Sequence, residues 1–369
     1  MLALTNETAD LLNEVQKLID PGHLTLADHF LGYAATKCLV GVVELKVPDV
    51  LSAHDGPMKL DDLASACGAR ADRLRQAMRL LHNNNIFSYD EKTETFQNNH
   101  VSELLLVDHW TQWHNWITLY GNQFYDMARG IPGSLKEGEK RWPAQINYDT
   151  DLDMFSYFNQ QGWVGQLHKT LGSGAVAQAP GILADYPWAD VAHETVVDIG
   201  GGGGGFITTL MRAHPSMQGA LFDLPHVIEH AKPFFYDADG QYADLAPRVA
   251  DRNLISGDFF ESVPAFKIYT MKWCLHDWKD DDALKILRNI RKAIIESPES
   301  RLVVLESVLA GGRSARLSRY GDLNMLMAAN GGERTMAEWN SLAERSGWNI
   351  VRVHSLRNAW PCAIDMRPA

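Results

Sequence analysis

Cysteine is scarce in this chain of 369 residues, which limits the kinds of site that it can form. Its four cysteines, Cys38, Cys67, Cys274 and Cys362, are widely spaced, and no two of them form a CxxC pair. Disulfide scaffolds and zinc sites need cysteines in paired or regular spacings. The sequence therefore argues against both and predicts reduced thiols in a cytoplasmic protein. No cluster of metal ligands is evident either, so no metal is expected.

Positive charge is also in deficit, because the formal net charge is −12. An acidic chain is poorly suited to binding nucleic acid or acidic membrane surfaces. A long uncharged run is missing from the first 20 residues, whose apolar positions are interrupted by Glu7, Asp10, Glu14, Lys17 and Asp20. That pattern argues against a signal peptide or a membrane span. We therefore expect neither nucleic acid nor a membrane among the partners.

About the first 180 residues lack strand–helix alternation and have a largely helical pattern. Residues 60–81 contain two short helical stretches separated by a turn at Gly68, the pattern of a helix-turn-helix. Residues 84–89 and 95–97 flank a polar turn and are predicted to form a small β-wing. Together these segments predict a winged helix.

Two functions suit this predicted winged helix. DNA binding has some support from the basic residues of its second helix, Arg70, Arg73, Arg75 and Arg79. A basic face is, however, more often a solvated surface of a protein–protein scaffold. The acidity of the whole chain favours the scaffold.

Residues 107–165 are rich in aromatic side chains and Met. Most of these side chains are expected in the core or between helices, although such a set could also form a flat apolar cleft for a planar ligand. Glycines and prolines predict loops at residues 130–149 and 172–187, and the second loop is expected to link the two halves of the chain.

The segment Thr195–Ile199 runs directly into six consecutive glycines, residues 200–205. A β-branched strand followed by glycines is typical of a tight strand-to-helix turn whose backbone presses against a ligand, because a Cβ atom would block the approach. The run fits both G-x-G-x-G and G-x-G-x-x-G, so it predicts a nucleotide-like cofactor without identifying it. Taken alone, it is also compatible with a purely structural turn.

From about residue 193 the pattern alternates between strands and helices, as in a doubly wound parallel sheet. The last two strands are joined by a short link, residues 356–361, which permits only antiparallel pairing. Strands are predicted at residues 195–199, 219–224, 253–257, 266–271, 302–308, 350–354 and 362–366, and helices at 281–296 and 336–346.

Chemically informative residues follow three of these strands. Asp223 ends the second strand, where an acid can hold both ribose hydroxyls of a nucleoside, although it could also cap a helix. Asp258 and Phe259 follow the third strand and suit the amine and the face of an adenine. His276 follows the fourth strand and is expected to face the ligand crevice, which favours a catalytic over a structural role.

These motifs resemble the S-adenosylmethionine-dependent small-molecule O-methyltransferases of the caffeic-acid and acetylserotonin type, which are common in plant and fungal secondary metabolism. The resemblance extends over essentially the whole chain and does not identify the substrate. The motifs that carry it occur in the family's order: residues 197–202 (VDIGGG), 222–225 (FDLP), 257–260 (GDFF), 272–278 (KWCLHDW), 306–309 (ESVL) and 331–335 (GGERT).

The resemblance implies a role for each matching position. His276 matches the general base, and Glu306 and Glu333 match the acids that flank and orient it. The cofactor contacts implied are Gly200, Gly202, Gly204, Asp223, Leu224, Asp258, Phe259, Lys272 and Trp278. The acceptor pocket implied is lined by Met154, Phe155, Phe158, Met325 and Asn330. The segment at residues 330–333 is two residues shorter than the plant pattern, and glycine replaces the usual Ser or Thr at Gly203.

The fold implied is a Rossmann-like methyltransferase sheet with an N-terminal, mainly helical winged-helix domain that dimerises. The resulting division is residues 1–110 for dimerisation, 111–185 for a connecting and substrate-lining region, and 186–369 for the cofactor-binding catalytic domain. The expected partners are a second copy of the chain and a small aromatic or polyketide-like acceptor, with a phenol as the expected hydroxyl.

The implied chemistry requires a base. A phenol has a pKa near ~10 and an ordinary histidine near ~6.5, so full ionisation before methyl transfer would be uphill by roughly 5 kcal/mol. Proton transfer that is coupled to methyl transfer avoids much of this cost. Carboxylates beside the imidazole stabilise its charged form and fix its tautomer.

Three other functions remain as alternatives. A relative that keeps the cofactor could instead catalyse a pericyclic rearrangement assisted by the sulfonium charge, but the presence of His276, Glu306 and Glu333 favours methyl transfer. A cofactor-sensing or DNA-binding regulator would use the winged helix. A nicotinamide dehydrogenase would explain the glycine run but not residues 275–278 or 331–335.

Overall fold

The computed structural model describes residues 2–249, 251–357 and 359–369, which form two compact units. The C-terminal unit comprises residues 178–369 and the first ten residues, and the N-terminal unit comprises residues 11–177. Two helices take part in both units, α1 (Leu2–Ile19) and α11 (Val164–Asp185).

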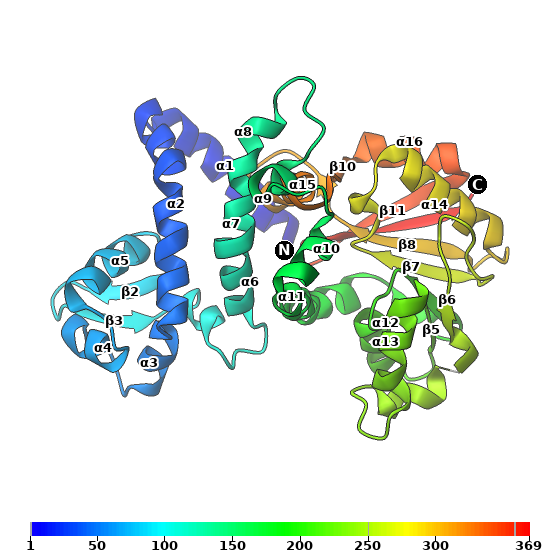
Figure 1. Ribbon diagram of the computed structural model, residues 1–369, viewed down its shortest axis with the longest axis horizontal. Coiled ribbons are helices and arrows are strands. Elements are labelled where there is room, and N and C mark those ends of the chain that lie inside the picture. Colours follow the sequence, from blue (N-terminus) through cyan, green and yellow to red (C-terminus); the bar gives the residue numbers. More distant parts are fainter. Residues whose placement is uncertain (1, 250, 358) are drawn as a thin grey trace. The chain divides into compact units, whose positions relative to one another are not determined.

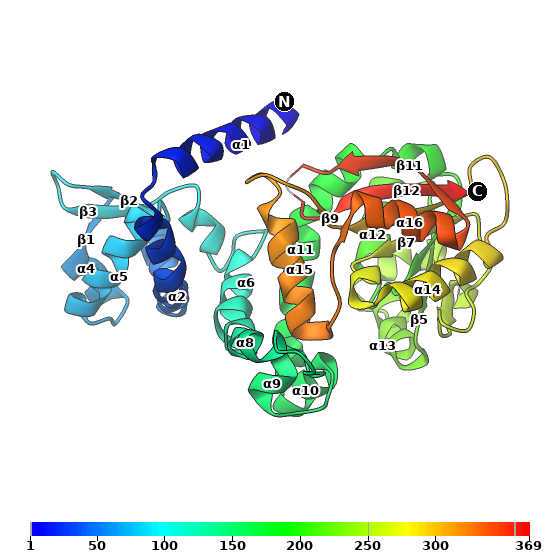
Figure 2. The same ribbon diagram turned by 90° about the horizontal axis from the view of Figure 1, so that it is seen from above.

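The C-terminal unit is built on a mixed sheet of seven strands in the order β11-β12-β8-β7-β4-β5-β6. The five strands from β8 to β6 in this order are parallel, while β12 is antiparallel to both β8 and β11. Figure 2 shows β11 and β12 running in opposite directions. The strands are β4 (Thr195–Ile199), β5 (Gln218–Asp223), β6 (Leu254–Ser256), β7 (Ile268–Lys272), β8 (Arg301–Glu306), β11 (Trp348–Ser355) and β12 (Cys362–Pro368).

Helices cover both faces of this sheet, as the alternation of side chains along a strand requires. Val196 packs into a core with α12 and α13, whereas its neighbour Val197 packs into a second core with α14 and α16. Figure 1 shows α14 and α16 together on one side of the sheet. Burial on both faces explains why β8 is apolar and buried over nearly its whole length. The helices are α12 (Gly205–Ala213), α13 (Pro225–Tyr236), α14 (Asp280–Ala293), α15 (Arg316–Ala329) and α16 (Met336–Ser346).

The strand order reverses between β4 and β7, which lie side by side although β5 and β6 come between them in the chain. In an open α/β sheet, ligands bind beyond the carboxyl ends of the strands at such a reversal. The predicted Rossmann-like sheet is thus confirmed, and its topology places the glycine run after β4 next to the segment that follows β7.

The N-terminal unit begins with the winged helix that the sequence predicts. Its core consists of buried side chains from α2, α3, α4, α5 and the wing strands β2 and β3. Figure 1 shows the wing strands beside α5. The elements are α2 (Gly22–Glu44), α3 (Val47–Ala53), β1 (Met58–Lys59), α4 (Leu60–Ala66), α5 (Ala71–Asn83), β2 (Phe87–Asp90) and β3 (Thr95–Asn98).

Two of the four arginines in this winged helix are paired with acids. Arg70 lies 2.8 Å from Asp72, and Arg75 lies 3.0 Å from Asp61. These exposed ion pairs neutralise part of the basic face that a DNA-binding function would require.

The rest of the N-terminal unit is helical, including two segments that the sequence predicts as loops. Residues 130–149 contain the short helices α8 (Ile131–Ser134) and α9 (Pro143–Tyr148). Residues 172–185 belong to α11, which continues through Pro180 because buried side chains such as Ile182 fix it by packing. The remaining elements are η1 (Ser102–Leu105), α6 (Trp113–Leu119), the π-helical turn η2 (Tyr120–Phe124), α7 (Tyr125–Met127), η3 (Ala128–Gly130) and α10 (Met154–Gln161).

Large apolar side chains of α1 and α2 are exposed within the N-terminal unit. The exposed fraction is 86% for Leu18 and 64% for Phe30, and Leu11, Leu12, Val15, Ile19, Leu26 and Leu31 are similarly exposed. So many exposed apolar side chains on two helices are typical of a protein–protein interface. Among the described residues, no helix combines the length and apolarity that crossing a membrane requires.

Candidate active site

The glycine run forms the turn between β4 and α12. Gly200, Gly202 and Gly204 have φ angles of +67°, +58° and +85°, values that residues with a side chain rarely adopt. Gly201 is constrained differently, because a Cβ atom there would lie 2.4 Å from Leu221 Cδ1. The three glycines predicted from the sequence therefore set the direction of the turn, while Gly201, which the prediction omitted, allows it to pack on β5.

Asp223, at the end of β5, is tied to this turn. Its Oδ2 atom accepts a hydrogen bond of 2.9 Å from the backbone N–H of Gly202, and its Oδ1 atom accepts one of 2.7 Å from Leu224. Leu224 itself is the residue that precedes α13, and its side chain is half exposed. The carboxylate thus lies at the rim of the glycine turn, where the sequence predicts the ribose hydroxyls.

Aromatic rings border the same turn. A Cβ atom added to Gly200 would lie 3.9 Å from the ring of Phe259, whereas one added to Gly202 would meet nothing within 4 Å. Trp278 stands edge-on to Phe259, with ring centroids 6.0 Å apart. Asp258, next to Phe259, accepts a hydrogen bond from Phe260 N and so holds its own loop in a turn. An open space beside a glycine turn, with a carboxylate and aromatic rings nearby, fits an adenosyl group.

Two buried ionisable groups, Asp198 and Lys272, lie behind the turn. Asp198, inside β4, accepts a hydrogen bond of 3.0 Å from Thr270 Oγ1, and burial raises the pKa of its carboxyl to about 7. Burial lowers the pKa of Lys272, at the end of β7, against the attraction of Asp198 and Glu306. Lys272 also places its ammonium 4.3 Å from the ring centroid of Trp273. The predicted cofactor residue Lys272 is therefore held by groups of the chain itself.

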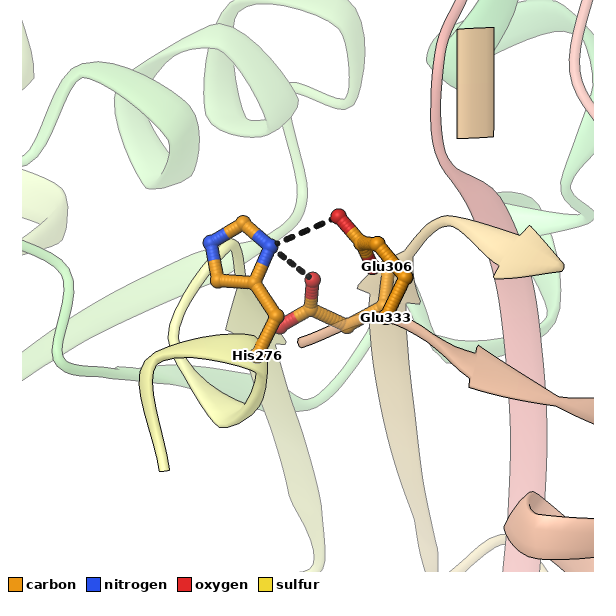
Figure 3. A group of neighbouring side chains, drawn as sticks. All are labelled: His276, Glu306 and Glu333. Atoms are coloured by element: carbon orange, nitrogen blue, oxygen red, sulfur yellow. Dashed lines mark hydrogen bonds and ion pairs between the residues drawn. The ribbon is translucent and has the colours of Figure 1, made fainter. Parts of the chain in front are cut away.

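His276 lies in the short turn η7 (Leu275–Asp277), which follows β7. Its Nδ1 atom donates a hydrogen bond of 3.0 Å to Glu333 Oε1 and lies 3.2 Å from Glu306 Oε2 (Figure 3). All three residues are buried, with exposed fractions of 8% or less. The structure thus brings together the three residues that the sequence predicts as the catalytic group, from β8, η7 and the segment before β10 (Arg334–Thr335).

Glu306 is held by two backbone amides, and Glu333 is held by the side chain of Asp322. The Oε1 atom of Glu306 accepts hydrogen bonds of 2.8 Å from Cys274 N and 2.9 Å from Leu275 N, so that its Oε2 atom is left facing the imidazole. The backbone N–H of Glu333 donates to Asp322 Oδ1 on α15 at 2.9 Å. No motif in the sequence pointed to Asp322, since it precedes Glu333 by eleven residues on a separate helix.

These contacts change the acidity of the group. Burial by itself lowers the pKa of the His276 imidazole, but the charge of Glu306 and the hydrogen bond to Glu333 outweigh burial and raise the pKa to about 9. Burial raises the pKa of Glu306 to about 7, although the nearby imidazole opposes that rise. Asp277 is the third carboxyl that faces the ring, with its Oδ1 atom 3.8 Å from Nε2, beyond hydrogen-bond distance.

The arrangement leaves Nε2 as the atom that can exchange a proton with a ligand. Nδ1 is occupied by the two carboxylates, which fix the ring orientation and favour the tautomer with a proton on Nδ1. Within the described part of the chain, the ligand atoms of His276, Glu306 and Glu333 lie within 4.8 Å of one another, a spacing that could also hold a metal ion. The expectation that the chain has no cluster of metal ligands is therefore wrong for these three residues, which in this structure contact one another through Nδ1.

The residues predicted to line an acceptor pocket lie on two helices. Met325 belongs to α15. Asn330 is the residue that follows this helix, and it has a φ angle of +55°. Phe155 on α10 is half exposed, while Phe158 is fully buried against Trp163. Met154 and Phe158 border a void of about 10 Å³, which is too small for an aromatic molecule. Their role in acceptor binding stays a prediction.

Comparison with known proteins is consistent with this geometry. Residues 178–349 match the O-methyltransferase domain, and residues 27–108 match the O-methyltransferase dimerisation domain. The chain is 58% identical to O-methyltransferase aclM of Aspergillus oryzae, over 100% of this chain and 85% of that protein.

Solved structures of methyltransferases share the fold. CalO1, a methyltransferase of calicheamicin biosynthesis solved in its SAH-bound form, is 28% identical with a TM-score of 0.80, over 94% of this chain and 98% of its own. NcsB1 is an O-methyltransferase of neocarzinostatin biosynthesis, solved with S-adenosylmethionine and 2-hydroxy-5-methyl naphthoic acid. It is 26% identical with a TM-score of 0.65, over 91% of this chain and 96% of its own.

Proposed function

Since this chain belongs to the S-adenosylmethionine-dependent O-methyltransferase family, we propose that it methylates a phenolic hydroxyl of a small aromatic or polyketide-like metabolite, with His276 as the general base. The observation that carries the proposal is the buried contact of His276 Nδ1 with Glu306 and Glu333, which leaves Nε2 to accept a proton. The phenolic class is supported by NcsB1, whose structure contains a hydroxylated naphthoic acid.

The glycine turn and the acids beside it are proposed to bind the methyl donor. Gly200, Gly202 and Gly204 would lie under its methionine and ribose portion, Asp223 and Leu224 beside the ribose, and Asp258 and Phe259 beside the adenine. S-adenosylmethionine, when bound, supplies a methyl group that its sulfonium already activates. What this chain must add is alignment of the acceptor and removal of the hydroxyl proton.

Lys272 and Trp278 complete the proposed donor site from its inner side. The ammonium of Lys272, at the end of β7, is attracted by the charge of Asp198 on the neighbouring strand β4. Trp278 supports the ring of Phe259 edge-on and would keep it in place against an adenine. These two residues therefore act mainly by holding the residues that contact the donor.

His276 is proposed to take the hydroxyl proton at Nε2 while the two carboxylates stabilise the imidazolium that forms. An ordinary histidine is about 3.5 pKa units weaker as a base than a phenolate, whereas a pKa of about 9 narrows that gap to roughly one unit. The carboxylates therefore lower the free-energy cost of moving the hydroxyl proton to the imidazole. The opposing cost is that the base must first lose its own proton at neutral pH.

The proposed domain roles follow the same division of labour. Residues 1–110 would form the dimer, 111–185 would connect and line the acceptor site, and 186–369 would bind the donor. The exposed apolar side chains of α1 and α2 support a homodimer, because a second copy would remove them from water. We propose that Met154, Phe155, Phe158, Met325 and Asn330 contribute to acceptor binding.

The test uses S-adenosylmethionine with a labelled methyl group and a panel of phenols that includes 1,4-dihydroxy-2-naphthoic acid. Transfer of label to a phenolic oxygen, with one S-adenosylhomocysteine formed per product, is the expected result. In the His276→Ala protein the transfer should fall by about 10²–10⁴-fold, the usual contribution of a general base, while binding of S-adenosylmethionine measured by calorimetry persists. Loss of an acceptor without formation of S-adenosylhomocysteine would indicate a non-methylating reaction instead.

A further inference from the structure

Arg334 makes an unusual set of contacts with the turn that carries His276. Its Nη1 atom donates a hydrogen bond of 3.1 Å to the carbonyl of Leu275, and its Nη2 atom donates one of 2.7 Å to the carbonyl of Trp278. Its Nε atom donates to Asp280 Oδ1 at 2.9 Å. One guanidinium thus holds backbone on both sides of His276 and the first residue of α14.

The segment that contains Arg334 also supplies the carboxylate partner of His276. Glu333 precedes Arg334, and its side chain accepts the hydrogen bond from Nδ1. One residue earlier, the backbone N–H of Gly332 donates a hydrogen bond of 2.8 Å to the carbonyl of His276. The two segments pack so closely that a Cβ atom on Gly331 would lie 2.0 Å from that carbonyl oxygen.

Arg334 is buried, with an exposed fraction of 5%, and its guanidinium carbon lies 5.5 Å from the ring centroid of Trp339. Its other contacts are all with one short stretch of chain, residues 275–280. A buried arginine that joins α14 to α16 would stabilise the fold with any carbonyl partners. Here the two carbonyls that Arg334 binds belong to residues on either side of His276.

We propose that Arg334 is a positioning residue of the methyl-transfer reaction, which locks the turn of His276 to the segment of Glu333 and so sets the contact between imidazole and carboxylate. The proposal rests on the proposed role of His276 as the base. In this proposal Arg334 contacts neither the donor nor the acceptor, and it acts through the geometry of the contact between His276 and Glu333.

The planar fork of arginine is essential to this role. Two nitrogen atoms at a fixed separation can bind two carbonyls at once and so define the distance between them, whereas a lysine ammonium is a single point that would follow one carbonyl. Arg334→Lys therefore keeps the charge and most of the apolar stem but removes the constraint. The turn would then be free to move relative to Glu333.

The pKa of His276 distinguishes a positioning role of Arg334 from a purely structural one, because a purely structural role would leave that pKa unchanged. The charged groups that face the ring are Glu306 from β8, Glu333 beside β10 and Asp277 from its own turn. All three raise the imidazole pKa above its ordinary value, and the charge of Glu306 contributes most among them. If the fork is lost and the contact with Glu333 loosens, the pKa of His276 should fall toward that ordinary value.

The experiment is an NMR titration of the protein labelled with ¹⁵N-histidine, together with calorimetry using S-adenosylhomocysteine as the probe. In Arg334→Lys the His276 titration should move down by about one unit or more, which is a tenfold or larger change in its proton affinity. Affinity for S-adenosylhomocysteine should fall by less than about tenfold, because Trp278 lies on the turn that Arg334 holds but the glycine turn lies on another segment. An unchanged His276 titration would overturn the proposal.

Arg291→Lys is the matched control. Arg291 lies on α14, donates from Nε to the carbonyl of Gly347 at 2.9 Å and contacts Glu296, so it also joins α14 to the segment after α16. Its replacement should lower stability without moving the His276 titration. If Arg291→Lys shifts that titration as much as Arg334→Lys, the effect is general loosening and the proposal is wrong.

Asp280→Asn provides a second variant should Arg334→Lys not fold. Asp280 is the exposed partner of the guanidinium, and its replacement removes the ion pair at Nε that orients the planar fork toward the two carbonyls. It should shift the His276 titration in the same direction by a smaller amount, and no shift would count against the proposal. Neither readout needs methyl transfer, so full turnover by His276→Ala would reject the base without touching the result for Arg334.

Discussion

Glu306 holds His276 in two ways at once. One carboxylate oxygen binds the backbone amides of the two residues before the histidine, and the other lies 3.2 Å from the imidazole Nδ1. The same side chain therefore shapes the turn and supplies negative charge to the ring that the turn presents. Glu333 supplies a second charge from a different segment, at 3.0 Å.

Replacing Glu306 with glutamine separates the two tasks. The amide oxygen can still accept from the backbone amides of Cys274 and Leu275, while the other end of the side chain now presents N–H groups to a ring nitrogen that also carries a proton. We expect Glu306→Gln to fold, but to lose at least about tenfold in kcat/KM because the imidazolium loses its stabilising charge. Steady-state kinetics checks this.

The control for Glu306→Gln is Glu338→Gln, which changes a carboxylate of the capping box of α16 in the same unit. It should alter stability slightly and leave kcat/KM unchanged. Wild-type kcat/KM in Glu306→Gln would show that charge at this position is unimportant for the reaction.

The pH dependence of kcat/KM follows from the raised pKa of His276. Only the neutral imidazole can accept a proton, and kcat/KM reports the ionisation of the free enzyme. Activity should therefore rise with pH up to about 9, instead of levelling off above the ordinary histidine value of about 6.5. A profile measured from pH 5.5 to 10 that is already flat at pH 7 would contradict this account.

The glycine turn allows two kinds of glycine to be told apart. Gly201→Ala would place a Cβ atom 2.4 Å from Leu221 Cδ1 and 2.7 Å from Asp198 Oδ2, so it should lower the free energy of unfolding by about 1–3 kcal/mol. Gly202→Ala meets open space and costs only the strain of its positive φ, about 1–2 kcal/mol.

The two variants should differ most in how they affect the donor. If the space beside Gly202 is filled by S-adenosylmethionine, Gly202→Ala should weaken binding of the donor by tenfold or more despite its milder structural effect. Calorimetry on both proteins, with urea unfolding for stability, gives the comparison. Equal donor affinity in Gly202→Ala and the wild type would place the donor elsewhere.

The exposed apolar surface of α1 and α2 predicts association between two copies. A charge buried in such an interface is costly unless it is paired, so Leu18→Glu together with Phe30→Glu should shift the protein from dimer to monomer in sedimentation analysis. Leu135→Glu is the control, because Leu135 is 73% exposed but lies outside these two helices. A wild-type protein that sediments as a monomer at micromolar concentration would overturn the prediction.

The sequence predicted the parts of the fold whose signals are local. The β-branched segment before the glycines forms β4 at the predicted residues, and α16 begins at Met336 and ends at Ser346 as expected. Local sequence signals mark the ends of both elements. A glycine turn follows β4, Thr335 caps the start of α16, and Gly347 ends α16 in the left-handed backbone conformation. The loop predicted at residues 172–187 is wrong for residues 172–185, which are helical. Packing of buried side chains there outweighs the low helix propensity of Gly172 and Pro180.

The sequence predicts which residues make up the candidate site, but it does not predict the contacts between them. Strand ends point to His276 and Asp223, and family resemblance adds Glu306 and Glu333. The contacts of Glu306 with backbone amides join residues more than 30 apart in the chain, and the contacts of Arg334 with backbone carbonyls join residues more than 55 apart. No periodicity or spacing in the sequence reveals them. Likewise, the raised pKa of His276 depends on carboxylates that only the folded chain brings to the ring, where their charge outweighs the opposing effect of burial.

The role of His276 as the general base is tested most directly by one paired measurement: methyl transfer and donor binding by His276→Ala under the same conditions. We expect the rate at which His276→Ala transfers the labelled methyl group to the acceptor to be at most about one hundredth of the wild-type rate. The dissociation constant of S-adenosylmethionine should change by less than about threefold. Transfer at close to the wild-type rate, with the donor bound normally, would contradict this role.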